Sequence, residues 1–244
     1  MKISKLIRKA NSFIKNLFFG CRPHIFLGWL QPVMFLVSNS LSLSKWMSRQ
    51  EKKTILNDFF QTRRDYNKRY QLYQYVIDTA GLKEAPIQFI EFGVSAGHSI
   101  KWWAEHICHP DSRFFGFDTF EGLPENWGTF SKGDMNSRIP QIDDERITFV
   151  KGLFQESVPN FIRDKNLRQH RKVIHLDADL FSSTLYALTS MAPLLQPGDI
   201  LLFDEFNVPN HEFLAFKMFT ESYYISPKLM GAVNNYLQVA LMIH

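Results

Sequence analysis

The chain has 244 residues, 45% of them hydrophobic, and a formal net charge of +4. This length and composition predict one sizeable core, formed by a single α/β domain with an N-terminal extension. Residues 1–24 carry six basic residues and no acid, so the remaining chain has a charge of −2 (4 − 6), which excludes a nucleic-acid-binding face on the folded body. The two cysteines, Cys21 and Cys108, have no metal-ligand spacing and favour a reducing compartment, so we expect a cytoplasmic protein.

Residues 1–45 are expected to form the extension, ahead of a folded domain at 46–244. Within 1–24, apolar residues recur at helical spacing on one face, and basic residues lie on the other. This pattern predicts a helix on an anionic membrane surface, at the inner face of the membrane; packing on its own domain or on a partner subunit of a homo-oligomer stays open as the alternative. The apolar stripe consists of Ile3, Leu6, Ile7, Ala10, Phe13, Ile14, Leu17 and Phe18.

A second apolar run covers Ile25–Val37. Gln31 and Pro32 interrupt it, and it is shorter than the ~20 residues that a spanning helix needs, so we expect no transmembrane anchor. A cleaved signal or transit peptide is not expected either, because no small-residue cleavage site follows a clean apolar core.

The segment Ser44–Leu82 is predicted to be helical and to lead into the domain (46–82), with Gly81 as its C-terminal stop. A run of basic side chains on this segment is interpreted as a solvated helix face, with contacts to ligand carboxylates as the alternative. These side chains are Arg63, Arg64, Lys68 and Arg69.

The most informative stretch follows the lead-in. Ile87–Ile90 predicts a buried strand, Gly93–Gly97 a tight turn, and the residues from Ser95 or Ala96 to Glu105 a helix. Glycines let the backbone approach a ligand, and free N–H groups at a helix start face it, so this is a cradle of the nucleotide-binding type. The alternative is a close-packed strand–helix corner.

An acid follows the strand. Glu91, expected at the mouth of the loop, would repel a pyrophosphate and attract the sulfonium and ammonium groups of S-adenosylmethionine. We therefore expect S-adenosylmethionine as the ligand, in contact with Gly93, Ser95, Gly97 and His98; for His98 a helix cap is the alternative.

The rest of the chain alternates strands and helices, which predicts a doubly wound, mostly parallel sheet with ligands at the carboxyl ends of its strands. A C-terminal antiparallel hairpin around Asn234–Asn235 closes the pattern. The predicted strands are Arg113–Phe117, Ile147–Val150, Val173–Leu176, Asp199–Phe203, Leu229–Val233 and Tyr236–Ile243; the predicted helices are Phe161–Asn166 and Ser183–Leu195.

Carboxylates end four of these strands, so one sheet edge receives Glu91, Asp118, Asp177 and Asp204. Asp118 follows Glu91 by 27 positions (118 − 91), near the offset of an acid that binds ribose hydroxyls; a turn cap is the alternative.

Hard oxygen donors gather at the ends of two later strands. One of Asp177 and Asp179 could bind a metal while the other caps the helix that starts near Ser182. Asp204 and Glu205 add oxygen donors of the kind that Mg²⁺ or Ca²⁺ takes, and solvated strand-end acids are the alternative.

Five motifs in this order, IEFGVSAGHS, FFGFDTFEGLP, VKGLFQESVP, IHLDADLFSSTLYAL and LLQPGDILLFDEF, resemble the macrocin O-methyltransferase type of class I S-adenosylmethionine-dependent methyltransferase. The resemblance covers about Phe89–Phe206. It implies a seven-stranded sheet, S-adenosylmethionine as methyl donor, and methylation of a sugar hydroxyl with a divalent metal such as Mg²⁺.

Matched residue by residue, the resemblance puts Glu91, Gly93 and Gly97 on the cofactor loop and Asp118 at the ribose. Asp177, beside the cofactor, falls on a metal position with Asp204 and Glu205. This chain has Asp204-Glu205 where the family usually shows Asp-Asp, and LDAD where it shows LDGD.

The expected acceptor is a saccharide or another hydroxyl-bearing small molecule, with Asp179 or His211 as the candidate base. His211 could equally start a helix or lie on the surface. Two other classes of protein stay open. One is a nicotinamide-dependent sugar oxidoreductase, although this chain lacks the third glycine and the Tyr-x-x-x-Lys pair of such enzymes. The other is a non-catalytic membrane-attached scaffold.

Overall fold

The computed structural model describes residues 2–244, which form two compact units, 2–42 and Leu43–His244. The first unit is helical. Its elements are α1 (Lys2–Gly20), α2 (His24–Leu27), the 3-10 helix η1 (Gly28–Leu30) and the start of α3 (Gln31–Ser48).

The predicted N-terminal helix is confirmed as α1, although the side chains of Ile3 and Leu6 lie outside the described ones. The predicted interruption at Gln31 and Pro32 is wrong. Pro32 stands in the first turn of α3, where a missing N–H costs no helical hydrogen bond, so the chain stays helical from His24 to Ser48.

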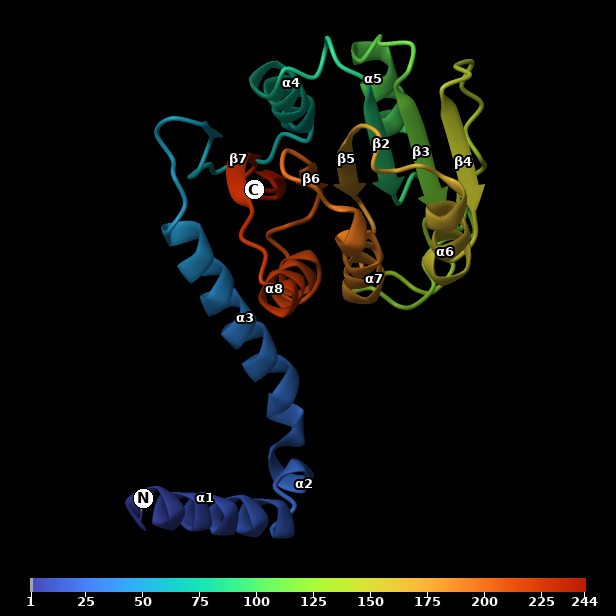
Figure 1. Ribbon diagram of the computed structural model, residues 1–244. Coiled ribbons are helices and arrows are strands. Elements are labelled where there is room, and N and C mark those ends of the chain that lie inside the picture. The colour runs from blue at the N-terminus through green and yellow to red at the C-terminus, as the bar shows by residue number, and fades with distance from the viewer. Residues whose placement is uncertain (1) are drawn as a thin grey trace. The chain divides into compact units, whose positions relative to one another are not determined.

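The second unit is built on an eight-stranded sheet with the order β1-β7-β8-β6-β5-β2-β3-β4 (Figure 1). Strand β8 is antiparallel to β6 and β7, and the other pairs are parallel. The strands are β1 (Leu56–Asn57), β2 (Ile87–Phe92), β3 (Arg113–Asp118), β4 (Ile147–Lys151), β5 (Arg171–Leu176), β6 (Ile200–Phe203), β7 (Lys228–Val233) and β8 (Gln238–Met242).

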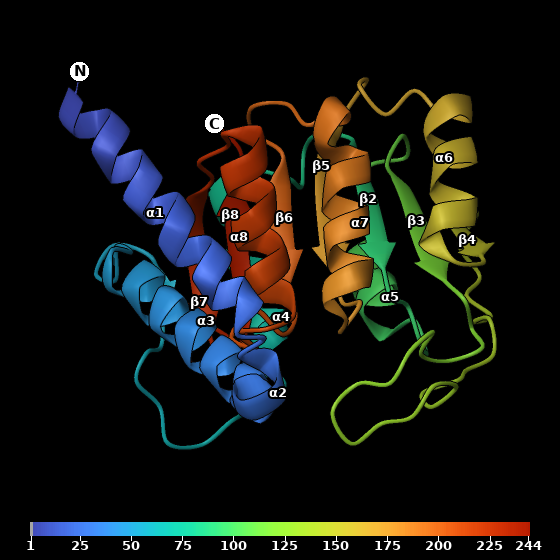
Figure 2. The same cartoon turned by 90° about the horizontal axis from the view of Figure 1, so that it is seen from below.

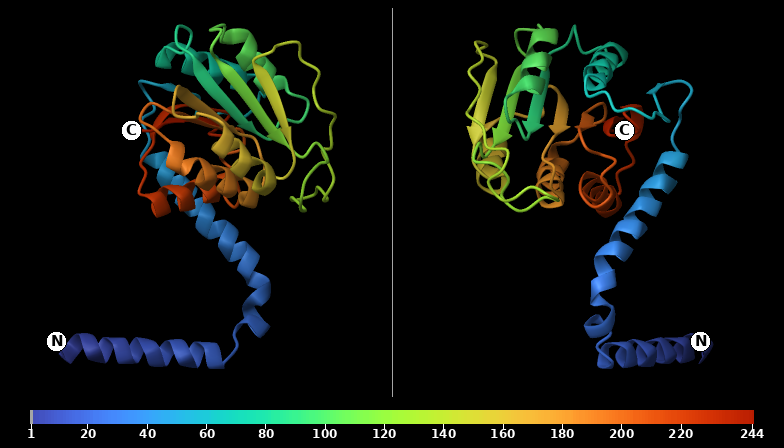
Figure 3. Two further views of the ribbon diagram at one scale, coloured as in Figure 1. Left: turned by 45° about the vertical axis from the view of Figure 1, so that its right-hand side comes forward. Right: turned by 180° about the vertical axis from the view of Figure 1, so that it is seen from behind.

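Helices cover both faces of this sheet (Figures 2 and 3). Alternate strand residues point to opposite faces, so Phe89 packs in one apolar cluster and Ile90 in the other. One face carries α4 (Lys68–Ala80) and α5 (His98–His106); the other carries α6 (Phe154–Asp164), α7 (Phe181–Met191) with η2 (Ala192–Leu194), and α8 (Glu212–Tyr223). The predicted doubly wound α/β fold is confirmed, with one short strand, β1, beyond the predicted seven.

The predicted helical lead-in is wrong between α3 and α4, where residues 49–67 form an irregular segment containing β1. Side chains of the C-terminal hairpin bind its backbone: the N–H groups of Gln61 and Asp65 donate to Asn235 Oδ1 (2.8 Å) and Asn234 Oδ1 (3.0 Å). These long-range bonds replace helical ones. The predicted stop is confirmed, because Gly81 ends α4 in the left-handed region at φ +62°.

Candidate active site

A cavity of about 560 Å³ opens at the carboxyl ends of β2, β3, β5 and β6. One part of its lining is acidic, and another part is apolar and aromatic. The lining residues are Tyr66, Gly93, Ser95, Asp118, Thr119, Gly122, Leu123, Pro124, Glu125, Trp127, Met135, Leu153, Phe154, Gln155, Asp177, Ala178, Asp179, Ser182, Ser183 and Glu205.

The glycine turn joins β2 to α5. A Cβ on Gly93 (φ +90°) would lie 1.8 Å from the carbonyl oxygen of Asp177, and one on Gly97 (φ +76°) would lie 2.8 Å from Pro140 Cγ. Packing alone therefore requires glycine at both positions, in agreement with the alternative that this turn is a close-packed corner between strand and helix. Gly93 and Ser95 also line the cavity, whereas Gly97 is buried and His98 is exposed at the start of α5.

The prediction that Glu91 stands at the mouth of the loop is wrong, because β2 continues to Phe92 and encloses it. Its carboxyl is 1% exposed and lies 2.9 Å from His175 Nδ1, and His175 Nε2 lies 3.0 Å from the Tyr73 hydroxyl. Burial raises the pKa of Glu91 well above its usual range and lowers the pKa of His175 to about 4. Glu91 thus belongs to a buried chain of polar contacts on the face of the sheet that α4 covers.

Asp118 ends β3 and faces the glycine turn. Its Oδ2 accepts hydrogen bonds from the N–H groups of Val94 and Ser95, and its Oδ1 accepts one from Phe120, each at 2.8 Å. The turn-cap reading is therefore correct. Because a carboxylate has about four acceptor positions, Asp118, which also lines the cavity, keeps capacity for a ligand hydroxyl.

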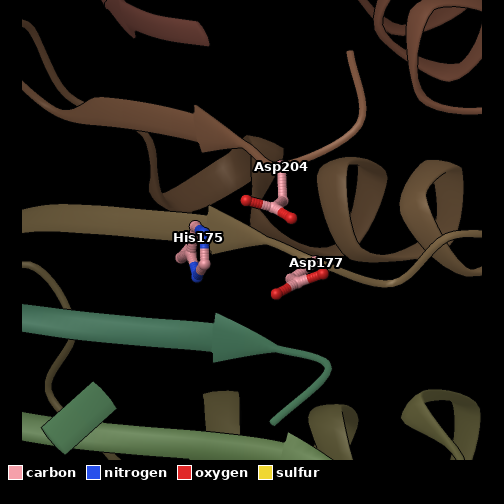
Figure 4. A group of neighbouring side chains, drawn as sticks. All are labelled: His175, Asp177 and Asp204. Atoms are coloured by element: carbon pink, nitrogen blue, oxygen red, sulfur yellow. The ribbon is translucent and has the colours of Figure 1, made fainter. Parts of the chain in front are cut away.

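Two of the predicted metal ligands meet at the ends of β5 and β6 (Figure 4). Asp177 and Asp204 each place a carboxylate oxygen within 4.8 Å of the other and of a His175 ring nitrogen. Both nitrogens of His175 already contact Glu91 and Tyr73, which leaves the two carboxylates as the candidate ligands of an ion. Burial, and next the charge of Asp204, raise the pKa of Asp177 well above its usual range.

Glu205 lies apart from this pair. Its carboxylate lines the cavity 3.7 Å from the Arg64 guanidinium, and its N–H donates to Glu212 Oε2 at 2.9 Å. Asp204 has its own partners, since the Tyr66 hydroxyl donates to its Oδ2 at 3.0 Å and Arg69 lies 3.8 Å from its Oδ1.

The two candidate bases differ in their access to the cavity. Asp179 lines it, and burial, followed by the charges of Glu205 and Asp204, raises its pKa to about 7. His211 precedes α8, is not among the lining residues, and contacts Trp127 edge to face at 6.3 Å between ring centres. Asp179 is therefore the better placed of the two.

Sequence reasoning missed the apolar wall and Tyr66. Trp127 and Phe130 stack at 5.4 Å and are joined by two backbone hydrogen bonds, which fixes Trp127 at the cavity. The aromatic residues in a turn-rich stretch were the available signal. Glu125 Oε1 accepts a 2.6 Å hydrogen bond from Ser182, which ties this loop to the first turn of α7.

Residues 90–206 match the family described as a methyltransferase domain. This match supports the methyltransferase class that the motifs indicate.

One curated relative is the 8-demethyl-8-(2,3-dimethoxy-alpha-L-rhamnosyl)-tetracenomycin-C 4'-O-methyltransferase of Streptomyces olivaceus, 27% identical over 164 residues. The match covers 58% of this chain and 61% of that protein, so the chain spans less than two thirds of the relative's length.

Two solved structures share the fold. The calicheamicin methyltransferase CalS11 has a TM-score of 0.56 at 20% identity, covering 84% of this chain and 91% of that chain. The O-methyltransferase NovP has a TM-score of 0.56 at 17% identity, covering 72% and 78%.

Proposed function

We propose that this protein transfers the methyl group of S-adenosylmethionine to a hydroxyl of a saccharide or of a sugar-bearing small molecule. The observation that carries the proposal is the set of carboxylates, Asp118, Asp177, Asp179 and Glu205, that line one cavity beside the glycine turn of a methyltransferase domain. The name of the curated relative, a 4'-O-methyltransferase for a rhamnosyl compound, supports oxygen as the acceptor atom.

The cavity fits the proposed methyl donor. Its volume of about 560 Å³ lies in the range of small-molecule sites, roughly 300–1,000 Å³. Carboxylates along one wall favour the sulfonium and ammonium charges electrostatically. Gly93 and Ser95 offer backbone for close approach, and Asp118 retains acceptor positions for ribose hydroxyls.

S-Adenosylmethionine supplies an electrophilic methyl carbon: the acceptor oxygen forms a bond to it as the carbon–sulfur bond breaks, leaving S-adenosylhomocysteine. The hydroxyl must lose its proton in this step, and Asp179, at the cavity wall, is the residue we assign to receive it. The apolar wall around Trp127 would hold the acceptor in line and exclude water.

A divalent cation also suits this wall. Asp204 is buried and Asp177 is half-buried, and a cation would offset the like charges of their carboxylates. Asp177 and Glu205 also line the cavity. Asp177 and Asp204 would hold the ion, and Mg²⁺ there would lower the pKa of a bound acceptor hydroxyl.

Calorimetry with S-adenosylmethionine and with NAD separates the proposal from the oxidoreductase alternative. We expect saturable binding of S-adenosylmethionine only, and transfer of radiolabelled methyl groups to members of a panel of sugar nucleotides and methyl glycosides. Binding of NAD in its place, or binding of neither molecule, would refute the proposal.

For the location of the enzyme we propose the cytoplasmic side of a membrane, with α1 in peripheral contact with anionic lipid. The support is the basic and apolar pattern of α1, whose described apolar side chains are exposed, Phe13 by 68% and Ile14 by 63%.

A further inference from the structure

The first 50 residues contain no Asp or Glu and eight basic residues. Their charges are unevenly spaced: six precede residue 23, none falls within 23–44, and Lys45 and Arg49 follow. An uncharged stretch of 22 residues is thus flanked by positive charge at both ends. This charge pattern complements an anionic lipid surface.

The uncharged stretch differs from α1 in the distribution of its apolar side chains. In α1 they form one face opposite a basic face. From α2 into the first half of α3 they are exposed: Phe26 is 71% exposed, Trp29 74% and Met34 66%. A helix that is apolar on every side belongs in a protein core or in lipid.

The exposed apolar part of this helix is shorter than a bilayer is thick. At 1.5 Å per residue, Ile25–Val37 covers about 20 Å, against the ~30 Å of a hydrocarbon layer. By length and composition the whole helix His24–Ser48 can cross a membrane, but its second half is rich in serine, and Leu43 packs in the core of the second unit. Basic residues are also enriched on the cytoplasmic face of membranes, and they flank both ends here, so we expect both ends on the same side.

We propose that Ile25–Val37 is immersed in the cytoplasmic leaflet as a monotopic insert whose two ends lie on the cytoplasmic face, with α1 in the headgroup layer. This goes beyond a peripheral contact of α1 and does not depend on the methyl-transfer proposal. The occupant of the apolar surface is lipid, and neither a second copy of the chain nor a spanning topology is required.

The native cysteines test the topology. Cys21 precedes the insert, Cys108 lies in the second unit, and both are exposed. Full-length Cys108→Ser and Cys21→Ser variants, each with one thiol, are expressed in bacteria and treated with a membrane-impermeant maleimide in right-side-out and inverted inner-membrane vesicles. We expect both thiols to react in inverted vesicles only. Labelling from opposite sides would mean a spanning helix and overturn the proposal.

Extraction tests the burial. In 1 M NaCl the Debye length is about 3 Å, so a chain held by charge alone is released. We expect the full-length protein to stay in the membrane pellet in 1 M NaCl and to leave it in detergent. Recovery in the soluble fraction as an oligomer, or N-terminal sequencing that shows residues 1–44 removed, would identify a subunit interface or a signal sequence and overturn the proposal.

A matched pair of variants locates the insert. Met34→Lys adds a charge within it and should weaken partition into vesicles of anionic and neutral phospholipid about a hundredfold. Met218→Lys adds the same charge at a 43% exposed position of α8 and should leave partition unchanged. Equal binding of Met34→Lys and the unmodified chain would overturn the proposal.

Discussion

Substitution of Asp118 by alanine should weaken the fold and the cofactor site together. Its carboxylate accepts three backbone N–H bonds at 2.8 Å, two from the glycine turn and one from Phe120. Bonds to a charged acceptor stabilise by about 1.5–3 kcal/mol each. The three share one half-exposed carboxylate, and water can replace part of them, so we expect a loss of roughly 2–4 kcal/mol in the free energy of unfolding.

Urea unfolding measures this loss, and calorimetry on the still-folded fraction measures the affinity for S-adenosylmethionine, which should fall by ~1–3 kcal/mol. Asp118→Asn is the matched control variant, because its amide has only one oxygen and must point its NH₂ group towards backbone N–H donors. It should cost nearly as much stability as alanine. If alanine lowered the affinity while leaving the unfolding free energy unchanged, Asp118 would be a ligand residue only, and the role in holding the turn would be refuted.

Four further outcomes are expected. Asp179→Asn should lower kcat about 10²–10⁴-fold with little change in the affinity for the methyl donor. In a pH profile, the rate of the unmodified enzyme should rise through about pH 7 as the Asp179 carboxyl loses its proton, and the variant should not show this rise. After chelation Mg²⁺ should restore methyl transfer, and Asp204→Asn should not respond; full turnover in excess chelator would contradict a metal role. Gly93→Ala should cost about 3 kcal/mol or more in urea unfolding, because its Cβ would meet Asp177 O. Phe13→Asp on the apolar face of α1 should reduce vesicle flotation more than Ser12→Asp on its polar face, and equal effects would exclude an oriented contact.

Apolar runs in the sequence predicted the strands of the sheet well. Buried parallel strands are continuously apolar, so the local sequence is enough to identify them. The lead-in was wrong for the opposite reason. Its local pattern is helical, but Asn234 and Asn235, about 170 positions away, bind its backbone, and no local signal reports such a contact.

The site shows the same division. The acids at the strand ends were found because strand ends share one edge, and Asp118, Asp177, Asp179 and Glu205 all line the cavity. Glu91 was misplaced because a charged residue was taken to end its strand, whereas His175, 84 positions later, accommodates it inside. A local sequence pattern does not reveal a buried partner that is distant in sequence.

The pairing of Glu91 with His175 also bears on how the sheet assembles. These residues are direct cross-strand partners of β2 and β5, and Tyr73 of α4 completes their contacts. A slip of β2 by one residue would turn Glu91 towards the opposite apolar layer and leave His175 facing Ile90 or Phe92, an arrangement with an unpaired polar group in a dry interior. The polar pair thus distinguishes the native alignment from neighbouring ones that similar apolar strands would otherwise tolerate. A substitution at one of these three positions is then constrained by the other two residues, so we expect the three positions to change together among related sequences.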